Sequence, residues 1–209
     1  MGLQNFITFI LTATLFIITP GIDTLLILNK GLSKGRTSAL KTSLGLNTGI
    51  ILHTLLAGFG LSLLIEKSEI VFNLIKYLGA FYIVYLGIVK MIEKEKPCTP
   101  IKNINIKNRL KSDYIAGLTT NILNPKVALF ILAFFPQFIT PLQTKNPVPY
   151  ILLGLTYSGI KLVWFIILIF LTEILTKNLK TNHKINLLID KISGAIFMLL
   201  GISILLNIL

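Results

Sequence analysis

The chain has 209 residues, of which 54% are hydrophobic and 13% charged, and its formal net charge is +12. A soluble domain carries about 25% charged residues, so this composition excludes an ordinary soluble protein and indicates an integral membrane protein. The lysines lie between apolar runs rather than on one basic face, so we expect contact with the lipid bilayer and no nucleic-acid partner. Cys98 is the only cysteine, which excludes an intramolecular disulfide and a multi-cysteine metal site.

Apolar runs recur along the chain, each near the roughly 20 residues that cross a hydrocarbon core. They cover residues 3–28, 40–65, 70–92, 114–135, 150–171 and 187–209, with a turn expected over 29–38. The first run is too long for a signal-peptide core and has no cleavage-site pattern, so we expect it to remain as a helix. The sequence therefore predicts an all-α membrane protein with six transmembrane helices.

Two prolines interrupt the first and fourth runs, in Thr19-Pro20-Gly21-Ile22-Asp23 and in Asn124-Pro125-Lys126. Thr19 and Asn124 are typical N-cap residues, and a proline favours the first position of a helix, so a new half-helix is predicted to start at each pair. A broken helix at membrane depth is tolerated only inside protein or beside a water-filled cavity. We therefore expect the two breaks to form two halves of one substrate site.

Basic residues indicate the orientation in the membrane. They concentrate in 29–38, 93–112 and 177–186, whereas the other two connections hold only Lys67 and Lys145. By the positive-inside rule, the three lysine-rich segments are cytoplasmic and both termini face outside. The alternative is a first segment that dips in and returns, which would leave five spans and an N-terminus inside.

An internal repeat supports six spans. Residues 45–50 match 154–160, and Lys76-Tyr-Leu-Gly-Ala matches Lys191-Ile-Ser-Gly-Ala. Together with the two proline breaks, each span of the first half has a counterpart in the second, in the same order. Copies of a three-span unit must be inverted, a recurring plan of secondary transporters. We expect a first repeat over 1–92, a cytoplasmic linker over 93–112 and a second repeat over 113–209.

The charges beside the breaks suggest what the site binds. Half-helix N-termini and the ammonium of Lys126 suit a carboxylate, and Asp23 suits an amine, so a zwitterionic amino acid matches both. The alternative is that Asp23 only caps its own half-helix and that Lys126 only neutralises it. A charge within the membrane costs about 2.5 kcal/mol on insertion scales, which favours a function. The expected substrate-binding residues are Pro20, Gly21, Asp23, Asn47, Asn124, Pro125 and Lys126.

Other polar or small residues lie within the spans. His53 is either a proton carrier, alongside Asp23, or a neutral structural histidine. Lys161 either contacts substrate or protons, or pairs with Asp23. Gly45 and Gly49 form a small-xxx-small pair that is expected to pack helices closely, and such faces permit a homodimer. No resident metal or other cofactor is expected.

Both interrupted segments resemble signatures of a known family. Residues 19–29, followed by Gly35-Arg36 and 45–53, resemble the first half of the lysine exporter (LysE/RhtB) family, and 123–130 with 134–138 resemble its second half. Ile22 departs from the pattern, because the family usually has a second proline there. The resemblance implies six helices, a bacterial cytoplasmic (inner) membrane, and export of amino acids or related metabolites driven by the proton gradient. It does not fix the substrate.

These observations favour a secondary exporter that works by alternating access and proton antiport. A divalent metal-ion exporter of similar repeat plan is the alternative, although Asp23, Asn47 and His53 make a poor cage for a cation. An intramembrane enzyme would need His53 as base and a serine such as Ser158 as nucleophile, but no nucleophile motif surrounds any serine. We therefore expect a transporter and not an enzyme.

Overall fold

The computed structural model describes residues 2–61, 69–92 and 113–178, and, from the C-terminal segment, 191, 194–195, 197–199 and 201–206. Apart from a bridge between Leu3 and Ile139, all regular structure in these residues is helical, as predicted. The helices are α1 (Phe6–Ile18), α2 (Ile22–Lys34), α3 (Arg36–Leu55), α5 (Glu69–Ile92), α6 (Asp113–Ile122), α7 (Pro125–Phe134) and α8 (Pro147–Asn178). A π-helical turn, η1 (Leu56–Leu61), extends α3, and the short 3-10 turns η2 (Phe135–Phe138) and η3 (Pro141–Gln143) connect α7 to α8.

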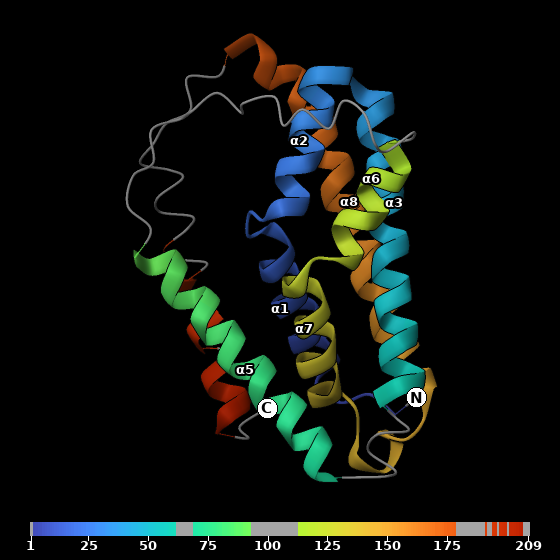
Figure 1. The fold of residues 1–209 in the computed structure, drawn as a ribbon, viewed down its shortest axis with the longest axis vertical. Coiled ribbons are helices and arrows are strands. Elements are labelled where there is room, and N and C mark those ends of the chain that lie inside the picture. Colours follow the sequence, from blue (N-terminus) through green and yellow to red (C-terminus); the bar gives the residue numbers. More distant parts are fainter. Residues whose placement is uncertain are drawn as a thin grey trace.

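Long apolar helices identify a multi-pass membrane protein. Residues Arg36–Gly60 and Pro147–Leu171 are each long and apolar enough to cross a membrane. Two bent pairs pass the same test together, α1 with α2 at a bend of 53°, and α6 with α7 and η2 (Pro125–Phe138) at a bend of 52°. Figure 1 shows each pair continuing along the long axis of the molecule across its bend. The predicted breaks in the first and fourth runs are therefore present, whereas much of the sixth run lies outside the described residues.

The local structure at the breaks differs between the two. Asn124 is the N-cap of α7, since its side chain accepts a hydrogen bond from Lys126 N, and Pro125 is the first residue of the helix, as predicted. The predicted N-cap at Thr19 was wrong. α2 begins at Ile22 with Gly21 as its N-cap, and the Thr19 hydroxyl instead donates to Leu15 O, 2.8 Å away, in the last turn of α1.

The turn expected over 29–38 is much shorter than predicted. α2 continues to Lys34, and Gly35 alone joins it to α3, with a positive φ of 83° that glycine adopts without strain. Lys30 therefore lies in a helix, where it is buried and its Nζ lies 2.6 Å from Asp113 Oδ1. This ion pair ties the end of α2 to the start of α6.

Glycines set the closest helix contacts. A Cβ at Gly45 on α3 would overlap the backbone carbonyl of Tyr114, and one at Gly117 on α6 would overlap that of Thr42. Gly49 meets the Asn121 side chain in the same way. The expected packing role of Gly45 and Gly49 is therefore confirmed, and it places α6 directly against α3.

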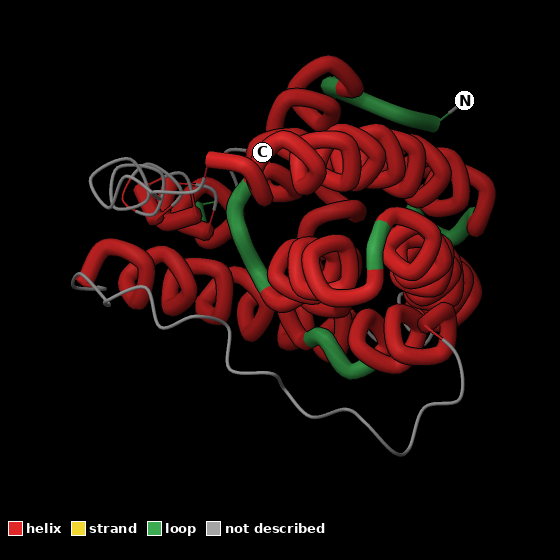
Figure 2. Tube along the Cα trace, turned by 90° about the horizontal axis from the view of Figure 1, so that it is seen from above, coloured by secondary structure: helices red, strands yellow, loops and turns green. Residues whose placement is uncertain are grey.

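The hydrophobic core is rich in aromatic rings and lies beside the breaks. Phe16 on α1 stacks on Phe130 of α7 with 3.9 Å between ring centroids, and Phe197 of the C-terminal segment packs 5.1 Å from Phe16. Figures 1 and 2 both show α5 and the described part of the C-terminal segment together at one side of the helix cluster. A Cβ at Gly87 of α5 would approach the carbonyl of Gly194, so these two segments are also in close contact.

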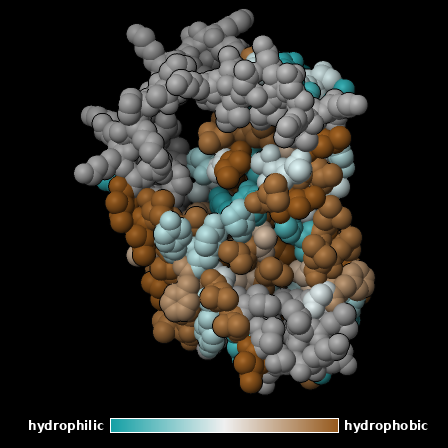
Figure 3. Space-filling view, in the orientation of Figure 1, coloured by the Kyte–Doolittle hydropathy of each residue, from teal (hydrophilic) through white to brown (hydrophobic). Residues whose placement is uncertain are grey.

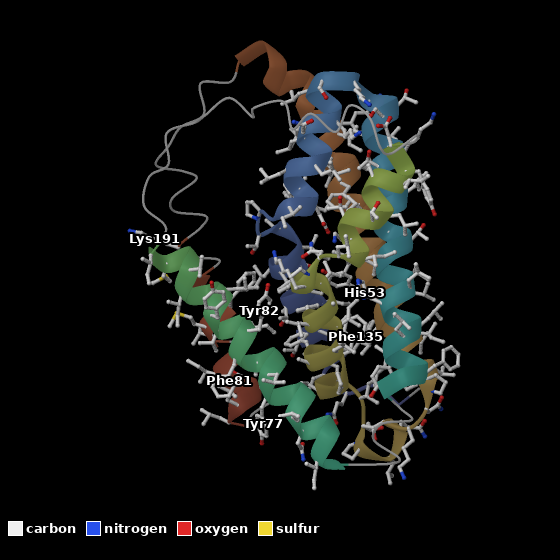
Figure 4. All side chains as sticks on the ribbon, in the orientation of Figure 1. His53, Tyr77, Phe81, Tyr82, Phe135 and Lys191 are labelled. Atoms are coloured by element: carbon white, nitrogen blue, oxygen red, sulfur yellow. The ribbon has the colours of Figure 1, made fainter. Side chains whose placement is uncertain are left out.

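The outer surface is apolar. Large hydrophobic side chains such as Ile7, Ile70 and Leu155 are exposed, as expected where lipid replaces water. Figure 3 shows hydrophobic side chains over most of the described part of one face, with hydrophilic side chains near its middle. In Figure 4, Phe81 lies on the outer side of α5 whereas Phe135 lies among the helices.

The glycine contacts give the first testable prediction. Gly45→Ala and Gly117→Ala should each lower the free energy of unfolding by about 1–3 kcal/mol, because the added methyl group forces the two helix backbones apart. Gly159→Ala on α8 is the matched control, since a Cβ there would meet open space. Thermal unfolding of the purified protein in detergent measures the difference, and equal stability of all three variants would contradict the close crossing.

Candidate functional site

The two helix breaks lie against each other. Asn124 Nδ2 at the second break donates to Asp23 Oδ1 at 2.9 Å, and Lys126 Nζ lies 3.3 Å from the Thr19 carbonyl at the first. A Cβ at Gly21 would lie 3.5 Å from Lys126 Nζ. Segments about a hundred residues apart in sequence are therefore in direct contact at the two breaks.

A small cavity separates the breaks. It offers about 20 Å³ to the centres of water-sized molecules, which is room for a water but not for an amino acid. Four of the predicted substrate-binding residues line it, namely Gly21, Asp23, Asn124 and Lys126. The other lining residues are Phe16, Ile17, Thr19, Thr24, Val127, Tyr157 and Lys161.

Asp23 is at the centre of a buried polar cluster. Its Oδ2 lies 2.5 Å from Lys161 Nζ and accepts from Asn121 Nδ2 at 3.0 Å, while Oδ1 accepts from Asn124. Both Asp23 and Lys161 are almost fully buried. A buried ion pair is tolerated only when further hydrogen bonds satisfy the charged groups, and the two asparagine amides supply such bonds to the Asp23 carboxylate. Of the two alternatives left open for Lys161, the structure shows the pair with Asp23.

Lys126 contacts the end of the first half-helix. Its Nζ lies 3.4 Å from Phe16 O and 3.3 Å from Thr19 O, and 4.5 Å and 5.2 Å from the ring centroids of Phe16 and Phe197. The two carbonyls lie at the negative, C-terminal end of α1. Sequence reasoning missed this contact because it considered only the N-terminal helix end that each break creates.

Four predicted site residues do not line the cavity. Pro20 and Pro125 form the breaks themselves. Asn47 joins α3 to α8, since its Oδ1 accepts from Ser158 Oγ at 2.8 Å. His53 Nε2 lies 3.2 Å from the Asn121 carbonyl oxygen in the last turn of α6. A carbonyl only accepts hydrogen bonds, so in this contact Nε2 carries the proton.

Sequence reasoning did not single out Asn121 and Tyr157. Asn121 precedes Asn124 by three residues, a spacing that places two side chains on one side of a helical turn, and this signal was available. Tyr157 is buried, with its ring centroid 5.9 Å from Lys161 Nζ. It lies one turn before Lys161 on α8, but nothing in its local sequence distinguishes it from a core tyrosine.

Comparisons with known proteins identify the family of the chain. The family model described as LysE type translocator matches residues 14–208. An uncharacterised membrane protein of Bacillus subtilis (strain 168), YrhP, is 33% identical over 208 residues, or 96% of this chain and 98% of its own length. Proteins named leucine efflux protein, from Enterobacter sp. (strain 638) and Klebsiella pneumoniae, are both 29% identical across 94% of this chain and 92% of theirs.

No solved structure matches the chain. The family match covers nearly its whole length and includes both proline breaks. As its motifs predicted, the chain belongs to the family of LysE type translocators, whose members are membrane transporters and not enzymes.

Proposed function

We propose that this translocator exports amino acids or amino-acid-like metabolites from the cytoplasm of a bacterium across its inner membrane, by proton antiport and alternating access. Relatives named leucine efflux protein support the substrate class. The observation that carries the mechanism is the meeting of the two breaks around the buried pair of Asp23 and Lys161 and the half-buried Lys126.

The transport mechanism rests on a six-span inverted repeat, with units 1–92 and 113–209 joined by a cytoplasmic linker and with both termini outside. The nearly equal bends of α1–α2 and α6–α7 support this plan. The helices that follow the two bent pairs also support it. α3 follows the first pair and α8 the second, and the two helices run in opposite directions along the molecule (Figure 1). Rocking of one unit against the other would move the two breaks apart.

The substrate binds between the breaks in this proposal. Its carboxylate faces the ammonium of Lys126 and the N-terminus of α2, whose first intrahelical bond runs from Leu25 N to Gly21 O and leaves the preceding N–H groups available. Asp23 and Asn124 complete the site. Pro20 and Pro125 act by breaking the helices, and Asn47 acts by holding α8 through Ser158.

Proton coupling is proposed at Asp23, with His53 as the second candidate. Protonation of Asp23 would remove its charge and weaken the contact with Lys161, and so loosen α2 from α8. The present cavity is too small for an amino acid, so binding requires such a separation. A divalent cation fits less well, since no group of three His, Cys, Asp or Glu side chains in the described part of the chain could hold one.

Transport measurements test the site directly. In inside-out vesicles with an acidic interior, uptake of labelled L-leucine should fall about tenfold to a hundredfold in Pro125→Ala and Lys126→Met, because each change displaces the groups that position the substrate. Lys145→Met is the control, since Lys145 is exposed and lies away from the breaks. Wild-type uptake in both site variants would refute the assignment.

The ion pair makes a separate prediction about stability. Asp23→Asn and Lys161→Met should each lower the free energy of unfolding by about 3–5 kcal/mol, because each leaves one buried group without its partner. The double variant should lose much less than the sum of the two. Thermal unfolding of all four proteins forms a double-mutant cycle, and additive losses would show that the two side chains do not interact.

A further inference from the structure

The carbonyl of Asn121, in the last turn of α6, lacks its usual helical donor. A helical carbonyl normally accepts from the N–H four residues later, which here would belong to Pro125, and proline has none. The Asn121 carbonyl oxygen instead accepts from Asn124 N at 3.0 Å and from Nε2 of His53 on α3, 3.2 Å away (Figure 4). A side chain of another helix therefore supplies one of the backbone hydrogen bonds at the second break.

The side chain of Asn121 also packs against α3. A Cβ at Gly49 would lie 2.6 Å from Asn121 Oδ1, so this oxygen is in close contact with the glycine. Oδ1 is buried and accepts no hydrogen bond in the described part of the chain, whereas Nδ2 donates to Asp23 Oδ2 at 3.0 Å. Gly49 and His53 are four residues apart and so lie on the same side of α3. Together they hold the side chain and the backbone of Asn121 in the orientation that directs its amide to Asp23.

We propose that Gly49 and His53 position Asn121 on Asp23, and that His53 serves transport as a permanent hydrogen-bond donor and not as a proton carrier. The inference rests on the proposed proton coupling at Asp23 and removes the second candidate for it. Asn121 is then a further positioning residue of the site, because it acts on the substrate and the proton only through the Asp23 carboxylate.

The contacts of His53 favour this role over proton transfer. The Asn121 carbonyl accepts the hydrogen of Nε2 and has no proton of its own to pass on. The Asn121 amide likewise keeps both of its hydrogens when it donates to Asp23. His53 does not line the cavity between the breaks, whereas Asp23 and Lys161 do. A proton on His53 therefore has no route to Asp23 through Asn121, although the hydrogen bonds between them fix the position of the carboxylate.

Three substitutions of His53 separate the two roles. Glutamine places an amide N–H donor where Nε2 lies but exchanges no proton, asparagine has its amide nitrogen at the position of Nδ1, and leucine has no donor. In inside-out vesicles with an acidic interior, His53→Gln should keep at least about half of the wild-type uptake of labelled L-leucine, whereas His53→Asn and His53→Leu should lose about tenfold. Tyr114→Phe is the matched control and should keep its uptake, because it removes a different hydrogen bond between α6 and α3, to Thr48 Oγ1 at 2.9 Å.

Proton movement is measured in the same vesicles. Addition of L-leucine should dissipate the pH gradient in His53→Gln in proportion to the leucine uptake of this variant. Leucine uptake without proton movement in His53→Gln would show that His53 carries the proton, and would overturn the proposal. Equal loss of uptake in all three variants, or wild-type uptake in all three, would overturn it as well.

A spectroscopic measurement tests the positioning without transport. In protein carrying Asn124→Ser, which keeps an N-cap oxygen, dephasing of the Asp23 carboxyl carbon by ¹⁵N in asparagine side chains reports the contact with Asn121. This dephasing should remain in His53→Gln and largely disappear in His53→Leu and in Gly49→Ala. Unchanged dephasing in His53→Leu would overturn the proposal. If the wild type takes up no L-leucine, the proposed function fails for that substrate, and the dephasing still decides whether His53 holds Asn121 on Asp23.

Discussion

Two prolines in the membrane-spanning helices impose the constraint on which the site depends. Each interrupts a helix at a depth where backbone groups must find partners within the protein. Pro20 leaves the Phe16 carbonyl without its helical donor, and Lys126 from the second break contacts it. Asn124 caps its own half-helix and donates to Asp23 at the first break. Residues of the second break therefore bind groups at the first, which fixes the two halves of the chain together at this level.

Charge is concentrated at the same place. Asp23 and Lys161 are buried, Lys126 is half-buried, and the three side chains come from α2, α8 and α7. Buried charges are costly unless they are paired, so separating these helices requires a change in the charges between them. A proton or a zwitterionic substrate can supply such a change. The proposed coupling of transport to protons would act through the same contacts that hold the helices together.

Sequence reasoning recovered the features that depend on local chemistry. The breaks, the N-cap at Asn124 and the packing of Gly45 and Gly49 follow from short motifs. Sequence reasoning failed where a contact with another residue, and not the local motif, determines the role of a side chain. The Thr19 hydroxyl bonds to the preceding turn instead of capping α2, and sequence alone left two alternatives for Lys161, of which the structure shows the pair with Asp23, 138 residues away. The lysine-rich turn expected over 29–38 is reduced to Gly35, and Lys30 lies within α2, where it pairs with Asp113.

The contact between the two breaks can be measured in a lipid bilayer. Solid-state NMR of protein labelled with ¹³C at aspartate side-chain carboxyls and ¹⁵N at asparagine side-chain amides reports contacts between these groups. The structure places Asn124 Nδ2 2.9 Å and Asn121 Nδ2 3.0 Å from oxygens of Asp23. We predict one aspartate signal that is strongly dephased by amide nitrogen, and that loses part of this dephasing in Asn124→Ala. An aspartate spectrum without such dephasing would show that the breaks do not meet.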